Sequence, residues 1–315
     1  PSEPLAADSS ATIASNVGEL AAAERLSSSS WPMVAANPQR TSWNSVEVRG
    51  TLRPVWYRVI DAYIPPKVQV IAAGGLLYVS TAAGLYAFHA DAGATAWVYP
   101  TDMPLGNSPT IYGGVAYVAG YDRRVHAIDA ATGAGIWTFQ ASAGFDSNPL
   151  VLELNGRTLV YLGCRDGKMY AIEDHGSYPS LAWSFATEGP ISYSAAYSDG
   201  VVYVASDDSH AYALDALTGG LVWQSAKLPG AGFQAWWPVI YQEPASGADL
   251  VLLAGSDNYR AFLAPGMGND MHMRDLWDVF PIRDSEPKGT PFGTRTGESV
   301  NASRVLQYLE AKPWR

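Results

Sequence analysis

Residues 114–139 read GVAYVAGYDRRVHAIDAATGAGIWTF, and residues 200–223 read GVVYVASDDSHAYALDALTGGLVW. Each stretch contains two short apolar runs separated by polar residues, then an Asp-x-x-Thr-Gly turn, and it reaches a Trp at Trp137 or Trp223. Apolar runs that alternate with clusters of Gly, Asp and Ser indicate strands and hairpins, because Asp bonds backbone amides and Gly adopts positive φ. Each stretch therefore predicts three antiparallel strands joined by tight turns.

The same pattern recurs along the chain at intervals of about forty residues. Its Trp positions are Trp56, Trp97, Trp137, Trp183, Trp223 and Trp277, with separations of 41, 40, 46, 40 and 54 residues. A further short apolar segment precedes four of the copies, at residues 110–112, 149–152, 193–197 and 238–241. A period near forty with four strands per copy is typical of propeller blades. We predict an all-β fold, a β-propeller of four-stranded antiparallel blades with about five blade repeats.

The repeat resembles that of the quinoprotein-type, PQQ-like β-propellers, which has the form A-x-D-x-x-T-G-x-x-x-W. Residues 127–137 and 213–223 match every fixed position, whereas the copy ending at Trp97 has His89 for Asp and Ala92 for Thr. The copy at residues 171–183 is two residues longer, and the fifth copy has lost the Asp and the Thr-Gly. The resemblance covers roughly residues 53–280 and implies that each Trp packs between neighbouring blades. It implies structural roles for Trp97, Trp137, Trp183, Trp223, Trp277, Gly133 and Gly219.

Three regions follow from the position of the repeats. Residues 1–30 are rich in Ala and Ser and are expected to form an N-terminal arm or linker with a short helix. Residues 31–280 are assigned to the blades; residues 31–43 resemble the opening segment of PQQ-like propellers, and residues 52–57 resemble an isolated outer strand. Residues 281–315 predict a loop and a short helix. Because five copies would leave an open arc, we expect the N-terminal part of a larger propeller; a self-closed ring of five or six blades is the alternative.

Composition narrows the class of protein. The 315 residues carry a formal net charge of −10 with no basic stripe, which disfavours binding to nucleic acid or to an anionic membrane. The sequence contains no run of eighteen apolar residues, so it predicts no transmembrane helix. The single cysteine, Cys164, is placed in the second strand of its copy and is interpreted as a small buried residue. The chain begins without Met and similar propellers are exported, so we expect a periplasmic, cell-surface or secreted protein.

Candidate binding residues lie in the loops that lead into the first strand of each copy. These loops recur at one place in every copy, so a propeller should gather them at a mouth of its central channel. Their polar and aromatic side chains suit hydrogen bonding and stacking on a ligand or a partner. The candidates are Asn107, Ser108, Asp146, Asn148, Tyr193, Gln234, Trp236 and Trp237. The alternative is that these groups satisfy backbone atoms where the strands begin.

The sequence predicts no catalytic residue and no metal site. The five His residues lack metal-ligand spacing. An Asp recurs at one position in four copies, as Asp122, Asp166, Asp208 and Asp257, which favours a role in hairpin turns. Quinoprotein dehydrogenases that resemble this chain often carry a vicinal Cys pair and bind PQQ with calcium. Asp146 and Asn148 would supply only part of such a calcium site.

We therefore expect a non-catalytic, exported propeller that serves as a protein-docking or assembly subunit, since loops on a rigid ring present one broad surface. The partner would be a protein with a basic surface, or a C-terminal polypeptide that completes the propeller. An outer-membrane assembly factor with a similar repeat is the nearest analogue by fold. Two alternatives remain: a carbohydrate- or cell-surface-binding propeller that uses Tyr193, Trp236 and Trp237, and a PQQ-dependent quinoprotein oxidoreductase with PQQ and calcium as cofactors.

Overall fold

The computed structural model describes the middle of the chain almost completely. The described residues are 30–43, 45, 51, 53–60, 62–65, 67–228, 233, 237–242, 249–253, 294–295 and 298–299. All regular structure in these ranges is β-strand. The predicted N-terminal and C-terminal helices and Trp277 lie outside these residues.

Four antiparallel four-stranded sheets follow one another along the chain, each with its strands in sequence order. The first contains β1 (Ile71–Ala73), β2 (Leu76–Thr81), β3 (Gly84–His89) and β4 (Thr95–Pro100). The second contains β5 (Thr110–Tyr112), β6 (Val115–Ala119), β7 (Arg124–Asp129) and β8 (Gly135–Gln140). The third contains β9 (Leu150–Leu154), β10 (Arg157–Gly163), β11 (Lys168–Asp174) and β12 (Pro179–Ala186). The fourth contains β13 (Ala196–Ser198), β14 (Val201–Ala205), β15 (Ala211–Asp215) and β16 (Leu221–Gln224).

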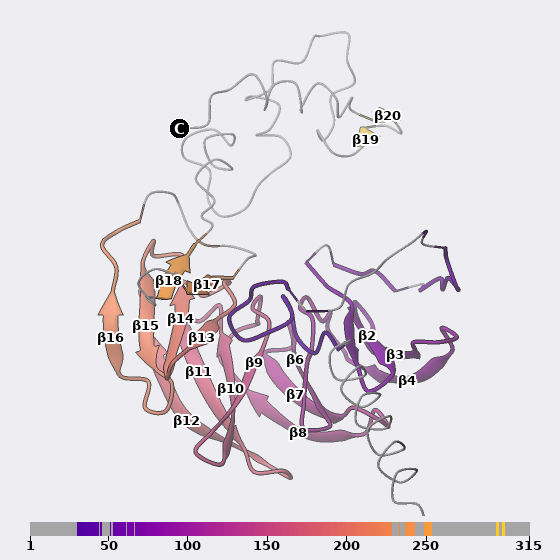
Figure 1. Ribbon diagram of the computed structural model, residues 1–315, viewed down its shortest axis with the longest axis horizontal. Coiled ribbons are helices and arrows are strands. Elements are labelled where there is room, and N and C mark those ends of the chain that lie inside the picture. The colour runs from indigo at the N-terminus through magenta and orange to yellow at the C-terminus, as the bar shows by residue number, and fades with distance from the viewer. Residues whose placement is uncertain are drawn as a thin grey trace, which may run out of the picture.

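Two further hairpins are present. One pairs β17 (Val239–Gln242) with β18 (Asp249–Leu252), and the other pairs β19 (Thr294–Arg295) with β20 (Glu298–Ser299). The sheets stand side by side as blades around an arc (Figure 1), and the first strands β1, β5 and β9 contact one another in turn. Strand β13 contacts β17, which continues the series after the fourth blade. The predicted propeller of four-stranded blades is confirmed, and its described blades form an open arc.

Side chains of the repeat close the turns of each blade. The Asp129 carboxylate accepts hydrogen bonds from the Thr132 backbone N–H and hydroxyl, both at 2.7 Å, and Asp215 is bonded in the same way by Thr218 at 2.8 Å. These bonds, led by the one from the Thr hydroxyl, lower the pKa of both carboxyl groups. Gly133 follows with a φ of 76°. The Asp-x-x-Thr-Gly signature is thus a turn that satisfies its own backbone.

Another Asp recurs after the second strand of the third and fourth blades, at Asp166 and Asp208, and it stabilises the hairpin between the second and third strands. One Asp166 oxygen accepts the Lys168 N–H at 3.0 Å, and the other accepts the Tyr170 hydroxyl at 2.6 Å. Asp208 repeats both bonds, with the Tyr212 hydroxyl again at 2.6 Å. The predicted hairpin role of this Asp is therefore confirmed in these blades.

The recurring Trp of each of the first three blades lies between its own blade and the next. Trp97, Trp137 and Trp183 are only 7–8% exposed. The indole N–H of Trp97 donates to the Ala130 carbonyl at 3.0 Å, and that of Trp183 donates to the Ala216 carbonyl at 2.9 Å. The predicted inter-blade packing is confirmed for these residues, whereas Trp223 on the fourth blade remains 38% exposed.

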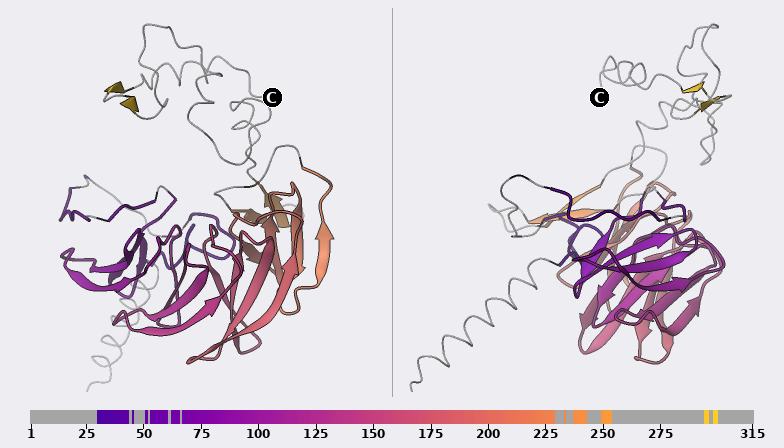
Figure 2. Two further views of the ribbon diagram at one scale, coloured as in Figure 1. Left: turned by 180° about the vertical axis from the view of Figure 1, so that it is seen from behind. Right: turned by 90° about the vertical axis from the view of Figure 1, so that its right-hand side faces the viewer.

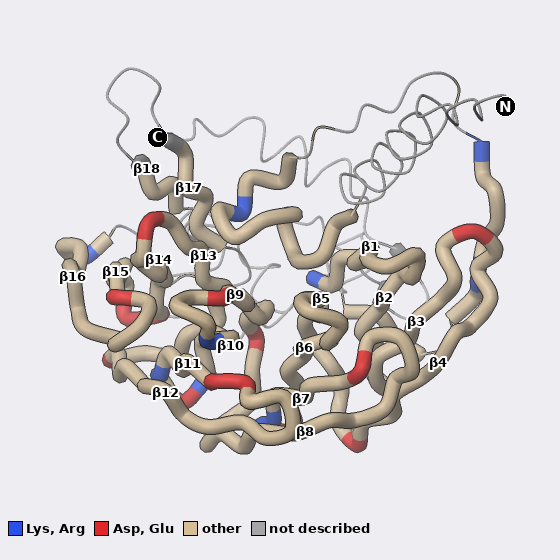
Figure 3. The backbone as a smooth tube through the Cα atoms, turned by 60° about the horizontal axis from the view of Figure 1, so that its bottom comes forward, with Lys and Arg blue, Asp and Glu red and all other residues tan. Residues whose placement is uncertain are grey.

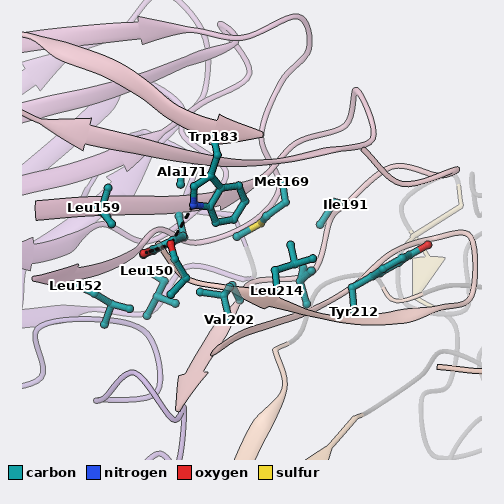
Figure 4. Packing of buried hydrophobic residues seen from close by; sticks show 14 of the residues in the cluster. Leu150, Leu152, Leu159, Met169, Ala171, Trp183, Ile191, Val202, Tyr212 and Leu214 are labelled. Carbon is teal, nitrogen blue, oxygen red and sulfur yellow. Dashed lines mark hydrogen bonds between the residues drawn. The ribbon is translucent and has the colours of Figure 1, made fainter. Parts of the chain in front are cut away.

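The hydrophobic core is divided among the boundaries between blades. Figure 4 shows the third boundary, where Trp183 and Met169 of the third blade meet Val202 and Leu214 of the fourth. Because the core is built pairwise, each blade depends on its neighbours for burial of its apolar face.

Two boundaries differ from the sequence prediction. Cys164 follows β10 instead of lying within it, because its backbone N–H bonds to Lys168 and closes the hairpin. Burial raises the pKa of its thiol to about 12, as expected for a small buried residue. Strand β13 begins at Ala196 instead of at residue 193, because Tyr193 and Ser194 bond to neighbouring loops.

Candidate functional site

The candidate residues lie in the loops that run from the last strand of one blade to the first strand of the next. Because strands alternate in direction, these connectors share one face of the arc with the hairpins between the second and third strands. Asn107, Ser108, Asp146, Asn148 and Tyr193 are all buried, with exposed fractions from 0 to 7%. The structure therefore brings them to equivalent places, but inside the protein.

Ser108 and Asn148 belong to a belt of hydrogen bonds that passes from blade to blade. The Gln69 backbone N–H donates to the Ser108 hydroxyl at 2.7 Å, and the Ser108 N–H donates to Oδ1 of Asn148 at 2.9 Å. The Asn148 N–H then donates to the Ser194 hydroxyl at 2.8 Å. In each step, a connector side chain accepts the backbone N–H of the preceding connector, so these residues hold adjacent blades in register.

Asn107 and Tyr193 also connect neighbouring loops. The Asn107 amide donates to the Phe145 carbonyl at 2.8 Å, while its buried Oδ1 has no partner among the described residues. The Tyr193 hydroxyl donates to the Trp237 carbonyl at 3.0 Å. Trp237 is partly buried against the core of the first two blades. Gln234 and Trp236 lie outside the described residues.

Asp146 is the candidate that reaches a charged, solvent-accessible group. It forms an ion pair with Arg165, whose side chain is 52% exposed and whose guanidinium lies 5.2 Å from the centre of the Tyr121 ring. Burial, followed by the charge of Asp146, raises the pKa of Tyr121. Lys67 is exposed, yet partial burial of its amino group lowers its pKa. The negative charge of Asp146 opposes this effect and raises the pKa of Lys67.

Arg165 and Tyr121 were not among the predicted residues, although a positional signal was available. Tyr121, Arg165 and Asp207 each directly precede the recurring Asp of their blade. Their backbone N–H groups donate to the connector of the same blade, at Pro104, Gly144 and Pro190 respectively. The repeat therefore places the backbone of this position against the connector in each of these three blades. Charged residues elsewhere are scattered over the blades without a continuous band of one sign (Figure 3).

The middle of the arc is occupied by the central segment, residues 31–42 (the darkest trace inside the arc in Figure 1). Trp31 pairs with Ala72 of β1, and the Pro32 carbonyl accepts the N–H of Ile111 on β5. Further along, the carbonyls of Pro38 and Gln39 accept the N–H groups of Tyr197 on β13 and Ile240 on β17. The central segment thus hydrogen-bonds through its backbone to the first strands of the first, second and fourth blades and to β17.

Arg40 fixes the end of the central segment. Its side chain is completely buried, and it donates to the carbonyls of Val34 at 2.7 Å, Ala195 at 2.9 Å and Pro149 at 3.3 Å. No acidic side chain in the described part of the chain pairs with it. Desolvation lowers the pKa of the guanidinium to about 9. Three carbonyl dipoles therefore stabilise a buried cation at the centre of the propeller.

The residues proposed for calcium do not fit a calcium site. The Asp146 carboxylate is paired with Arg165, and Oδ1 of Asn148 already accepts the Ser108 N–H. Calcium requires six to eight oxygen ligands that are directed at one point. Within the described ranges, no group of three or more His, Cys, Asp or Glu residues is placed to hold a metal ion. The same ranges contain no helix long and apolar enough to cross a membrane.

Comparison with known proteins places this geometry in a family. The sequence matches the family described as outer membrane protein assembly factor BamB over residues 37–179 and 177–241. A search of curated protein sequences found no significant match.

Solved structures share the propeller fold at low identity. The quinohemoprotein alcohol dehydrogenase ADHIIG from Pseudomonas putida HK5 gives a TM-score of 0.57 at 18% identity, covering 75% of this chain and 46% of that protein. The quinohemoprotein alcohol dehydrogenase from Comamonas testosteroni gives 0.59 at 16% identity, covering 70% and 45%. BamB from Moraxella catarrhalis gives 0.45 at 19% identity, covering 61% and 60%.

This chain therefore spans less than two thirds of the length of each solved protein. At these identities the dehydrogenases support the fold alone, whereas the family match covers more than half of the chain. The chain belongs to the PQQ-like propeller family described as outer membrane protein assembly factor BamB.

Proposed function

We propose that this protein is a non-catalytic, exported propeller that serves as a docking or assembly subunit for another protein. The observation that carries the proposal is the occupied centre of the arc, where the central segment bonds to the first strands and Arg40 is buried. A small-molecule site needs a concave pocket with convergent polar groups that are available to the ligand. Here the connector groups bond to neighbouring blades, which favours a rigid scaffold that acts through its surface.

The face of the arc that carries the connectors and the hairpins between second and third strands, here called the connector face, is the surface best suited to a partner. It presents Arg165 and Lys67 beside the buried Asp146, so it offers cationic groups on a protein with a net charge of −10. Charged groups at a rim orient a partner and accelerate its association. The family description supports a partner from the machinery that assembles outer membrane proteins.

Site-specific photocrosslinking in the cell of origin tests the proposal. A photoreactive amino acid replaces Arg165 on the connector face, and a matched variant replaces Thr132 in an exposed turn at the opposite ends of the strands. We expect position 165 to crosslink to an outer-membrane assembly protein and position 132 to give no such product. Equal crosslinking at both positions, or crosslinking only at 132, would contradict docking through the connector face.

A chemical assay separates this proposal from the two alternatives. Purified protein mixed with PQQ, calcium ions, an alcohol as electron donor and a redox dye should leave the dye oxidised, because the connector groups are engaged within the protein. Dye reduction that depends on PQQ would contradict the non-catalytic proposal. Glycan binding is disfavoured at Tyr193, which is completely buried and whose hydroxyl donates a hydrogen bond to the Trp237 carbonyl.

A further inference from the structure

The first two strands of each four-stranded sheet are joined by a turn of two residues, both with positive φ. The turns are Gly74–Gly75, Gly113–Gly114, Asn155–Gly156 and Asp199–Gly200. Because the four sheets follow one another around the arc (both views of Figure 2), these turns take equivalent places in their blades. Asn followed directly by Gly occurs once in the sequence, in the turn of the third blade.

The turn of the third blade differs from the other three in its length of pairing and in its hydrogen bonds. Strands β9 and β10 form five residue pairs, whereas the first two strands of each other blade form three, so the Asn155–Gly156 turn projects further. In the other blades, the carbonyl of the second turn residue accepts a backbone N–H from the turn between the third and fourth strands at 2.8–3.0 Å. These bonds run from Ala90 to Gly75, from Ala130 to Gly114 and from Ala216 to Gly200.

The third turn is not held in this way by any described residue. The His175 N–H donates instead to the Tyr178 carbonyl at 3.1 Å, and the Gly156 carbonyl accepts no backbone N–H within the described ranges. Asn155 and Gly156 are both exposed, and no atom lies within 4 Å of the place that a Cβ on Gly156 would take. Neither the Asn155 side chain nor the Gly156 N–H bonds to another described residue. Such a turn opens locally at low free-energy cost.

We propose that Asn155 is a site of spontaneous deamidation. The Gly156 backbone nitrogen attacks Cγ of Asn155, so a new N–Cγ bond closes a cyclic imide and the Cγ–Nδ2 bond breaks. The Gly156 amide proton leaves with Nδ2 as ammonia. Water then adds to either carbonyl of the imide and reopens the ring, which leaves Asp or isoaspartate at position 155. Glycine favours this attack because it has no side chain to shield its nitrogen.

The modification would change both the charge and the geometry of the turn. It converts a neutral amide into a carboxylate two residues before Arg157, whose guanidinium pairs with Glu173 at 2.6 Å. Isoaspartate also adds a carbon to the backbone between Leu154 and Arg157, which pair across the turn. Because the register of a hairpin is set by the length of its turn, isoaspartate should break this last pair.

Peptide mass spectrometry of stored protein tests the site and the reason for it. The variant Gly74→Asn places a second Asn–Gly pair in the hydrogen-bonded turn of the first blade. Position 74 accepts the side chain because its φ of 58° is close to the 53° of Asn155, and no atom lies within 4 Å of its Cβ position. The folded protein is stored in mildly alkaline buffer, which favours loss of the attacking amide proton, and a second sample is stored in urea.

Deamidation is measured at each position as the mass difference between water and ammonia. In the folded variant, position 155 should react several-fold faster than position 74, because the first turn is held by its bond to Ala90. In urea the two positions should react at similar rates, since both turns are then lost. No reaction at Asn155 in the folded wild-type protein, or equal rates at positions 155 and 74 in the folded variant, would overturn the inference.

Other asparagines in the same samples serve as internal controls. Asn107 should stay unchanged because it is buried and its amide donates to the Phe145 carbonyl at 2.8 Å. Asn148 should also stay unchanged because Pro149 has no N–H with which to attack. Asn155→Gly, which gives the third blade the turn residues of the first two, should remove the mass change from its peptide. These readouts do not involve a partner, so they are independent of the proposed docking function.

Discussion

Replacing Gly133 by Ala tests whether the glycine of the repeat exists to receive the Trp of the preceding blade. Gly133 has a φ of 76°, and a Cβ built on it would lie 2.7 Å from Cδ2 of Trp97. Two costs therefore combine in Gly133→Ala. The left-handed backbone costs an L-residue about 1–2 kcal/mol, and overpacking against a buried ring costs about 1–3 kcal/mol.

Gly156 provides a matched control because its φ is 74° but no atom lies within 4 Å of the place that a Cβ would take. Gly156→Ala should therefore cost only the conformational part, about 1–2 kcal/mol. Gly133→Ala should cost about 2–5 kcal/mol in total. The difference between the two variants isolates the contact with Trp97, because the backbone conformations are nearly the same.

Urea unfolding followed by Trp fluorescence measures both variants. The free energy of unfolding should fall more for Gly133→Ala than for Gly156→Ala, with similar dependence on urea concentration. Equal losses of stability would refute the packing argument, because the close approach of Trp97 would then carry no energetic cost. Combining Gly133→Ala with a smaller residue at position 97 should reduce the difference, since the two positions are in contact.

Two further predictions concern buried ionisable groups. Arg40→Lys keeps the positive charge but should lose two of the three hydrogen bonds to backbone carbonyls, and each lost bond should lower the free energy of unfolding by about 1.5–3 kcal/mol. The control is Arg157→Lys in a surface ion pair, which should lower the free energy of unfolding by less than about 1 kcal/mol in the same urea assay. Burial lowers the pKa of His126, against the opposing charge of Asp122. The folded state then binds the proton less readily, so stability is complete above about pH 6.5 and is lost as pH falls towards the folded pKa. His126→Tyr should weaken this loss in unfolding curves between pH 8 and 5; an unchanged pH dependence would contradict the assignment.

The propeller was predictable because its strands depend on local patterns. Residues 110–112 were predicted as a first strand and are observed as β5, and the turn residue Asp129 bonds within its own turn. The longer third copy obscured a change of hydrogen-bond acceptor at the boundary between the second and third blades. There the Asp174 carboxylate accepts the Trp137 indole N–H at 2.8 Å, in place of the backbone carbonyl used by Trp97. A repeat alignment does not show this exchange, because donor and acceptor belong to different copies.

The candidate site was predictable in position but not in orientation. Equivalence of the connectors predicts corresponding points for Ser108 and Asn148, yet only the structure shows that their side-chain oxygens accept backbone N–H groups of the preceding connector. Ligand binding by the named connector residues stays a prediction. Arg40 was missed because two of its three carbonyl acceptors, at Pro149 and Ala195, come from distant parts of the chain. Its presence in a segment of otherwise uncharged residues was the available signal.

The two ends of the arc follow from the way in which blades stabilise one another. Trp97 and Trp183 are buried because the next blade supplies a carbonyl acceptor and a glycine beneath the ring. Trp56 receives the same contacts from the first blade without a described strand beside it, so one half of a blade boundary is already built. The placement of Trp56 therefore follows the same rule as that of Trp97 and Trp183, because in each case the following blade supplies the carbonyl acceptor and the glycine that hold the ring.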